Sequence, residues 1–98
     1  MTRQEAVEIL SRNKRLLGDF QVDALYLFGS VARDEAGPES DVDLLVEFRE
    51  GARVGLFELA RLRGFLSKVL GCNVDVVTPD ALHPLLREGI MGEAVRAA

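Results

Sequence analysis

The chain contains very little cysteine and no long apolar run. Its one cysteine, Cys72, cannot form a disulfide within the chain, which favours a reducing, cytoplasmic environment. We predict that Cys72 is a small apolar residue at the start of a strand. No apolar run approaches the roughly 20 residues of a membrane span, and the N-terminus lacks the apolar core of a signal peptide. The sequence therefore predicts a cytoplasmic protein with no membrane contact.

The chain also lacks an excess of basic residues. Its 12 Lys and Arg are outnumbered by 16 Asp and Glu, which gives a formal net charge of −4. Broad nucleic-acid binding requires a basic surface that displaces counterions, so we do not expect it here. Binding of one triphosphate through a metal ion remains compatible with this charge. With 98 residues, of which 48% are hydrophobic, we expect one globular domain spanning residues 1–98.

Hydrophobic periodicity predicts helices and strands in the order α-β-turn-β-α-β-α. Thr2 and Glu5 form a capping-box pattern that opens the first helix, and Gly18 is a plausible end for it. The expected strands are 24–28, 41–48 and 72–77, the second long helix is 56–70, and short helices follow Thr78 and Pro79. We expect the first two strands to be antiparallel neighbours. The helix between the second and third strands then predicts a mixed sheet in an α/β (α+β) fold, with helices packed on it.

Three aspartates are the candidate catalytic and metal-binding residues. Asp41 and Asp43 are two apart in a strand, so their side chains point to the same face. Asp75 lies within the otherwise apolar run NVDVV, where a lone carboxylate is hard to explain by packing. Neighbouring carboxylates repel one another, and Mg²⁺, which prefers oxygen ligands, relieves that repulsion. Asp41 and Asp43 are the primary ligand candidates, and Asp75 either binds a second metal or accepts a proton.

A Gly-Ser pair and an arginine are the candidate nucleotide-binding residues. Gly29 lets the backbone approach an anion closely, and Ser30 offers both a hydroxyl and an amide to phosphate oxygens. Arg33 lies one helical turn on, where it either binds a phosphate or braces the aspartates. Each feature also has a plainer interpretation: the Gly-Ser pair can be an ordinary turn, and a D-x-D pattern at a strand start arises often by chance.

Taken together, the stretches GSVARD (29–34), SDVDLLV (40–46) and VDVV (74–77) resemble the motifs of the DNA polymerase beta-like nucleotidyltransferase superfamily. The resemblance is strongest to its minimal nucleotidyltransferase (MNT) domains, and it covers nearly the whole chain. It differs at one position, because Asp34 replaces the usual glycine after the arginine. If that position needs a positive φ, aspartate tolerates it better than most residues but less well than glycine.

The resemblance implies an enzyme that uses ATP and Mg²⁺ and a partner with a HEPN domain. MNT antitoxins of HEPN/MNT pairs transfer AMP to a tyrosine of their toxin partner, and such a complex implies an oligomer. In a second hypothesis, the chain is a weak or inactive nucleotide-binding module that neutralises its partner by direct contact. A third hypothesis, transfer to a small molecule such as an aminoglycoside, requires a substrate-enclosing surface and is the least favoured.

Overall fold

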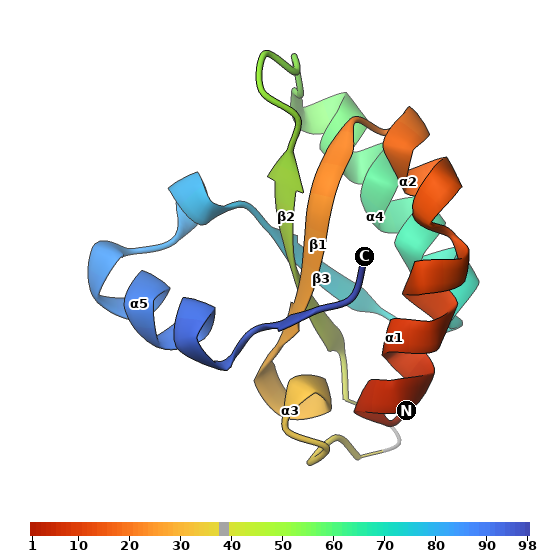
Figure 1. Cartoon of the computed structure of the whole chain (residues 1–98), viewed down its shortest axis with the longest axis vertical. Coiled ribbons are helices and arrows are strands. Elements are labelled where there is room, and N and C mark those ends of the chain that lie inside the picture. Colours follow the sequence, from red (N-terminus) through yellow and green to blue (C-terminus); the bar gives the residue numbers. More distant parts are fainter. Residues whose placement is uncertain (38–39) are drawn as a thin grey trace.

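Four strands form one mixed sheet in the computed structural model, which describes residues 1–37 and 40–98. The strands are β1 (Val22–Phe28), β2 (Val42–Phe48), β3 (Val74–Val77) and β4 (Val95–Arg96). Their order across the sheet is β3-β2-β1-β4 (Figure 1). β1 pairs antiparallel with β2 and β4, whereas β2 pairs parallel with β3. The predicted mixed sheet and the antiparallel pairing of the first two strands are confirmed; the turn predicted over residues 36–40 lies partly outside the described residues.

The N-terminal segment forms two helices rather than the one helix that the periodicity predicted. These are α1 (Arg3–Arg12) and α2 (Lys14–Asp19). Thr2 caps α1 as predicted, because its hydroxyl accepts the Glu5 N–H at 3.1 Å. The break falls at Asn13, whose side-chain amide donates to the carbonyl of Ile9 at 2.8 Å and whose own N–H turns back to Leu10. Gly18 lies inside α2 and does not end it, so that part of the prediction was wrong.

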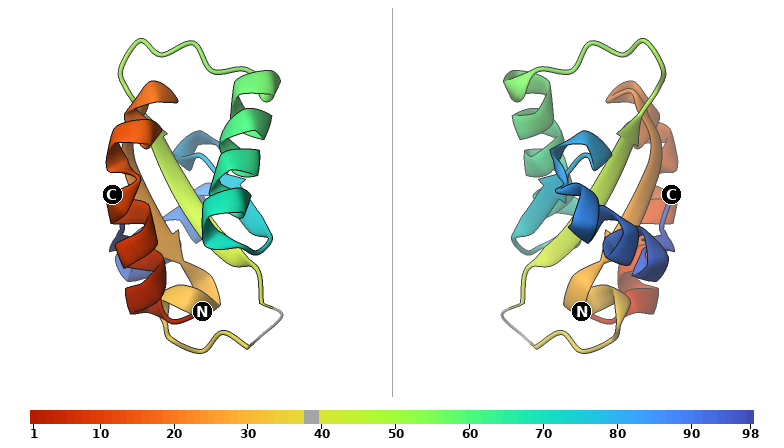
Figure 2. Two further views of the ribbon diagram at one scale, coloured as in Figure 1. Left: turned by 90° about the vertical axis from the view of Figure 1, so that its right-hand side faces the viewer. Right: turned by 90° about the vertical axis from the view of Figure 1, so that its left-hand side faces the viewer.

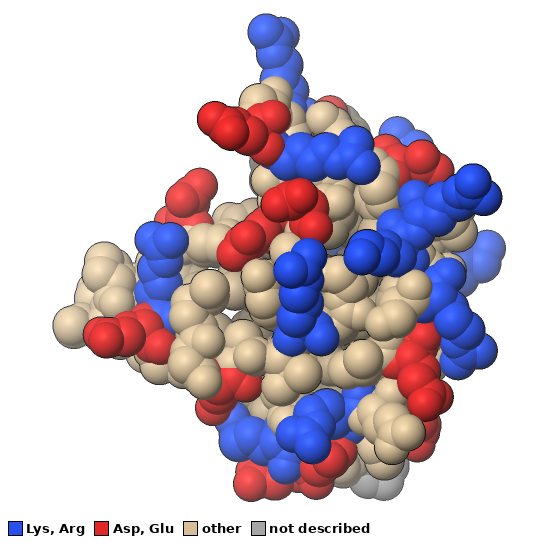
Figure 3. All heavy atoms as spheres, viewed as in Figure 1, with Lys and Arg blue, Asp and Glu red and all other residues tan. Residues whose placement is uncertain are grey.

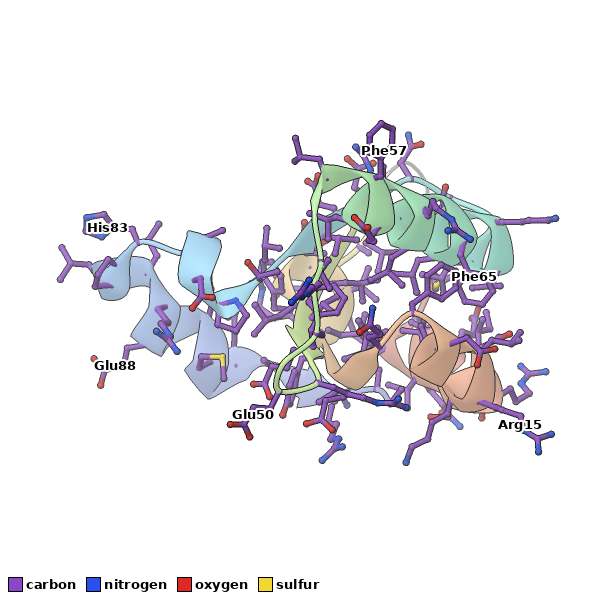
Figure 4. The ribbon with its side chains drawn as sticks, turned by 90° about the horizontal axis from the view of Figure 1, so that it is seen from above. Arg15, Glu50, Phe57, Phe65, His83 and Glu88 are labelled. Atoms are coloured by element: carbon purple, nitrogen blue, oxygen red, sulfur yellow. The ribbon has the colours of Figure 1, made fainter. Side chains whose placement is uncertain are left out.

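Three helices cover one face of the sheet (Figure 2). The third, α4 (Leu56–Leu70), has the predicted bounds and ends at Gly71, whose φ of 71° is left-handed. Phe65 points from α4 toward the N-terminal helices, where its ring lies 5.1 Å from that of Phe20 (Figure 4). The fully buried side chains of this core come from both layers and include Leu10, Leu62 and Leu66 from the helices and Leu27, Leu44 and Val46 from the strands.

The opposite face of the sheet carries the C-terminal segment. Thr78 and Pro79 open only a 3₁₀ turn, η1 (Pro79–Ala81), and α5 (Pro84–Glu93) follows. The sequence predicted short helices here, yet α5 is a single helix of 10 residues that continues through Gly89 and Gly92. α5 has no buried residue, and it lies on the side of the sheet away from α1 and α4 (Figures 1 and 2). This face is only partly covered: Leu45 on it is fully buried, whereas Asp43 and Glu47 on the same face of β2 stay partly exposed.

No helix within the described ranges, 1–37 and 40–98, is long and apolar enough to cross a membrane.

Candidate active site

The register of the sheet places Asp43 directly beside Asp75. The two residues are partners in the parallel β2–β3 ladder, and Phe28, the last residue of β1, is the partner of Asp43 on its other side. Val42 and Leu44 are buried in the core beneath α4, so the alternation of a strand turns Asp43 to the opposite, partly open face. Two carboxylates from segments 32 residues apart therefore share one end of the sheet.

The charges of Asp41 and Asp75 act on the carboxylate of Asp43. Its pKa is raised above its ordinary value, first by partial burial, then by the charge of Asp75, and then by that of Asp41. Arg33 opposes this rise but does not cancel it. Asp41 and Asp75 are themselves exposed to solvent. Asp43 is thus the least solvated member of a group of three like charges, and it gains most from a nearby cation.

Gly29 closes the site against Asp43. It has a φ of 72°, and a Cβ at this position would collide with the Oδ2 atom of Asp43. Both constraints favour glycine, because a residue with a side chain rarely adopts this φ and the site leaves no space for a Cβ atom. Gly29 begins α3 (Gly29–Ala32), a short helical turn that follows β1 directly. The backbone here lies directly against the carboxylate.

Ser30 and Arg33 follow on the same turn. Ser30 is partly exposed beside Gly29. The guanidinium of Arg33 pairs with Glu35 through Nε at 3.2 Å and with Glu93 through Nη1 at 3.1 Å. These two carboxylates hold its pKa above the ordinary arginine value, with the Glu35 hydrogen bond the largest contribution. Arg33 therefore acts on the aspartates only through its charge, whereas its hydrogen bonds go to glutamates.

Glu35 and Glu93 are the site residues that the sequence analysis missed. Glu93 reaches the site from the end of α5, 60 residues after Arg33. Glu35 is only two residues from Arg33, and an Arg-x-Glu spacing is too common to attract notice. The site residues that the sequence nominated come from segments that meet at one end of β2. They are Asp41, Asp43, Asp75, Gly29, Ser30 and Arg33.

The donor set of this site fits Mg²⁺. Its side-chain ligands are carboxylate oxygens, which are the donors that Mg²⁺ prefers, and their mutual repulsion is the property that a cation relieves. In the described part of the chain, no three His, Cys, Asp or Glu side chains already converge on one point suitable for a metal ion. Mg²⁺ commonly takes only one or two carboxylates, with substrate phosphates and waters completing its octahedron. Asp41 and Asp43 supply that number.

Asp34, which stands where the resembling motif has glycine, adopts the conformation that glycine would favour. Its φ is 56°, within the region that aspartate tolerates better than most residues. Its Oδ1 atom accepts the backbone N–H of Arg3 at 2.7 Å. The side chain thus ties the site loop to the first turn of α1, a bond that glycine cannot make.

A pocket of about 680 Å³ lies elsewhere, toward the other end of β2, among residues such as Phe48, Leu56 and Pro79. Its lining contains none of the three aspartates and neither Gly29 nor Ser30. A second pocket, of about 520 Å³, runs beside α4, and Asp75 is among its lining residues. The candidate active site is therefore an open surface notch rather than an enclosed cavity.

Comparison with known proteins identifies the family to which this arrangement belongs. Residues 6–97 match the model of the nucleotidyltransferase domain family. The chain therefore belongs to that family, and the predicted enzyme class is confirmed. The chain is also similar to the protein adenylyltransferase MntA of Thermococcus cleftensis, with 34% identity over 96 residues, which cover 97% of this chain and 95% of that protein.

Solved structures agree with this assignment. A "putative minimal nucleotidyltransferase" shares 38% of its residues with this chain and superposes with a TM-score of 0.82, covering 97% of this chain and 95% of that one. The predicted fold class is thus confirmed. A chain from the tri-AMPylated HEPN toxin of Shewanella oneidensis in complex with its MNT antitoxin has a TM-score of 0.67 at 19% identity, with 99% and 72% coverage. At that identity it shows a shared fold.

Replacing Asp43 by Asn is expected to stabilise the folded protein at pH 7. The raised pKa means that the folded state binds this proton more tightly than the unfolded state does. Stability therefore falls as the pH rises from the ordinary value of 3.8 through the raised value. Asn carries no charge, so the variant gains up to about 1 kcal/mol at neutral pH, a small gain because water screens a partly exposed group. Urea unfolding measured between pH 3 and pH 7 checks this.

The control for this experiment is Asp23→Asn, which removes an exposed carboxylate at the other end of β1. Its stability should follow that of the wild type across the same pH range. An Asp43→Asn variant that is less stable than wild type at pH 7, or equally affected at every pH, would contradict the interpretation of Asp43.

The stability of variants at Asp34 should depend on two things: whether the new residue tolerates a positive φ, and whether it keeps the hydrogen bond to the Arg3 N–H. Asp34→Asn keeps both and should unfold near the wild-type urea midpoint. Asp34→Gly keeps the φ but loses the bond, and Asp34→Ala loses both, so Ala should cost the most, about 1–2 kcal/mol. If Gly proves more stable than both Asp and Asn, the bond from Asp34 to the Arg3 N–H contributes nothing.

Proposed function

We propose that this chain transfers AMP from ATP, with Mg²⁺, to a tyrosine hydroxyl of a HEPN-domain partner and thereby acts as its antitoxin. The observation that carries the proposal is the convergence of Asp43, Asp75 and Gly29. The β-sheet register joins the two carboxylates, and Gly29 places a backbone free of a side chain directly against one of them. A phosphate chain carrying a cation matches such a notch in both charge and size.

The nucleotide is held by groups on two neighbouring segments. Asp41 and Asp43, at the start of β2, would hold Mg²⁺. When bound, the ion offsets the negative charge of the phosphates and the charge that develops during transfer. Gly29 and Ser30 offer amide and hydroxyl donors to the β- or γ-phosphate, and Arg33 offers a guanidinium from the same turn. Asp75, the exposed β3 neighbour of Asp43, would face the acceptor.

The transfer is an in-line displacement at the α-phosphorus. The acceptor oxygen forms a bond to phosphorus as the bond from phosphorus to the bridging oxygen of the β-phosphate breaks, and pyrophosphate leaves with that electron pair. The proton of the acceptor hydroxyl passes to Asp75. Because Asp75 is exposed, it then releases the proton to water. The products are an AMP–tyrosine phosphodiester on the partner and pyrophosphate.

The openness of the notch supports an acceptor on another protein. Asp41 and Asp75 are both exposed, so this chain does not enclose the position that an acceptor occupies. Large apolar side chains are also exposed elsewhere on the fold: Leu56 and Phe57 begin α4, and Leu85 lies on α5, with exposed fractions of 87%, 85% and 84%. Phe57 points away from the molecule in Figure 4. Exposed apolar residues of this size are typical of protein-binding surfaces.

The names of the similar proteins point the same way. One relative is a protein adenylyltransferase, and one structural neighbour comes from a complex with an AMPylated HEPN toxin. On the face seen in Figure 3, acidic and basic side chains are intermixed rather than separated into one broad patch. Apolar contacts supported by mixed charges therefore describe the partner surface better than a purely electrostatic match.

The transfer reaction predicts that Asp41→Asn and Asp43→Asn each lose at least about 100-fold in rate, because each removes charge directed at the transferring group. The assay mixes the protein with a HEPN-domain partner, Mg²⁺ and ATP labelled at the α-phosphate. Label on the partner and its intact mass report the transferred AMP. Asp23→Asn is the matched control and should keep the wild-type rate.

Neutralisation of the partner and the partner's mass, measured together, separate AMP transfer from neutralisation by contact alone. If both Asn variants neutralise the partner as well as the wild type while the partner's mass stays unchanged, contact alone accounts for the activity. Undiminished labelling by both variants would instead reject Asp41 and Asp43 as the residues that support transfer. A circular dichroism spectrum of each variant verifies that the fold is intact.

A further inference from the structure

A carboxylate of the protein itself lies on the groups proposed to hold a phosphate. The Oε1 atom of Glu93 accepts the N–H of Gly29 at 3.4 Å and Nη1 of Arg33 at 3.1 Å, and its Oε2 atom accepts the same Nη1 at 3.3 Å. A backbone N–H and a guanidinium that converge on one anionic group form the usual arrangement for binding a phosphate oxygen. The Glu93 carboxylate therefore uses the same two donors, the Gly29 N–H and the Arg33 guanidinium, that are proposed to bind a phosphate.

The position of Glu93 follows from the sheet rather than from α5. β4 pairs antiparallel with β1, with Arg96 opposite Tyr26 and Val95 opposite Leu27. Continuing this register by two residues places Glu93 opposite Gly29. The pairing of β4 with β1 therefore brings the glutamate within reach of the glycine.

We propose that Glu93 is a built-in competitor for the triphosphate: it occupies the Gly29 and Arg33 donors in the nucleotide-free protein and must withdraw when a nucleotide binds. This inference rests on the proposed function, since it assigns the same donors to phosphate. It makes Glu93 a residue that sets the affinity for nucleotide and takes no part in the transfer step.

The contact is weak enough for a nucleotide to displace. The side chains of Arg33 and Glu93 are 46% and 39% exposed, and an exposed ion pair contributes little to stability. The helix that ends in Glu93 is also loosely held, because α5 contains no buried residue, and Leu85 and Leu86 are 84% and 62% exposed. Glu93 therefore can move away with the end of α5 while β4 stays paired.

The test compares Glu93→Gln with Glu88→Gln. Both remove one negative charge from α5, but Glu88 is an exposed residue of the same helix and lies outside the contacts that hold Arg33. Isothermal titration measures the binding of Mg·ATP and, separately, of magnesium-free inorganic tripolyphosphate. We expect Glu93→Gln to bind both ligands about twofold to fivefold more tightly than wild type, because an occupied site lowers the apparent affinity. Glu88→Gln should bind both like the wild type.

A second measurement follows the movement itself. Hydrogen exchange at the end of α5, residues 90–93, should become faster in the wild type when the ligand is bound, because Glu93 loses its two partners. Weaker or unchanged binding by Glu93→Gln, or equal tightening by Glu88→Gln, would overturn the proposal, as would slower exchange at residues 90–93. The tripolyphosphate measurement requires neither Mg²⁺ nor AMP transfer, so it decides the role of Glu93 even where transfer to a protein is absent.

Discussion

The parallel pairing of β2 with β3 is the constraint on which the site depends. It fixes Asp43 opposite Asp75, and a shift of one residue would turn one of them into the core, because strand side chains alternate between faces. The apolar residues next to Asp43 and Asp75 prevent that shift, since Val42 and Val74 are themselves buried. The hydrophobic core thus places two charges side by side that would otherwise separate. Partial burial first, and then the repulsion from Asp75, raise the pKa of Asp43.

The same end of the sheet balances that negative charge with few positive groups. Arg33 is the cation whose charge acts on Asp43, and its hydrogen bonds go to Glu35 and Glu93. The notch is therefore rich in carboxylates and poor in unopposed positive charge, which suits a substrate that brings its own cation. A triphosphate with Mg²⁺ adds positive charge near the aspartates, and its phosphates would take the place of Glu93 at Arg33.

Local signals in the sequence predicted the elements whose ends are set locally. The helix predicted over 56–70 is α4 with the same bounds, and the Gly-Ser turn and the two strands around it lie where the pattern indicated. The prediction failed where a side chain or a distant strand decides the outcome. The amide of Asn13 breaks the first helix, and β4 has only two residues, which gain their conformation from pairing with β1. Glu93 could not be predicted for the same reason, whereas the spacing of Asp41, Asp43 and Asp75 was enough to nominate them as one group.

Paramagnetic relaxation by Mn²⁺, used in place of Mg²⁺ with an ATP analogue that cannot be hydrolysed, tests the central claim most directly. A bound Mn²⁺ ion broadens the NMR signals of nuclei close to it. The account predicts that broadening at low Mn²⁺ concentration centres on the amides of Gly29, Ser30, Asp43 and Asp75. Broadening centred on other carboxylates, with the amides of Asp43 and Asp75 left sharp, would contradict it.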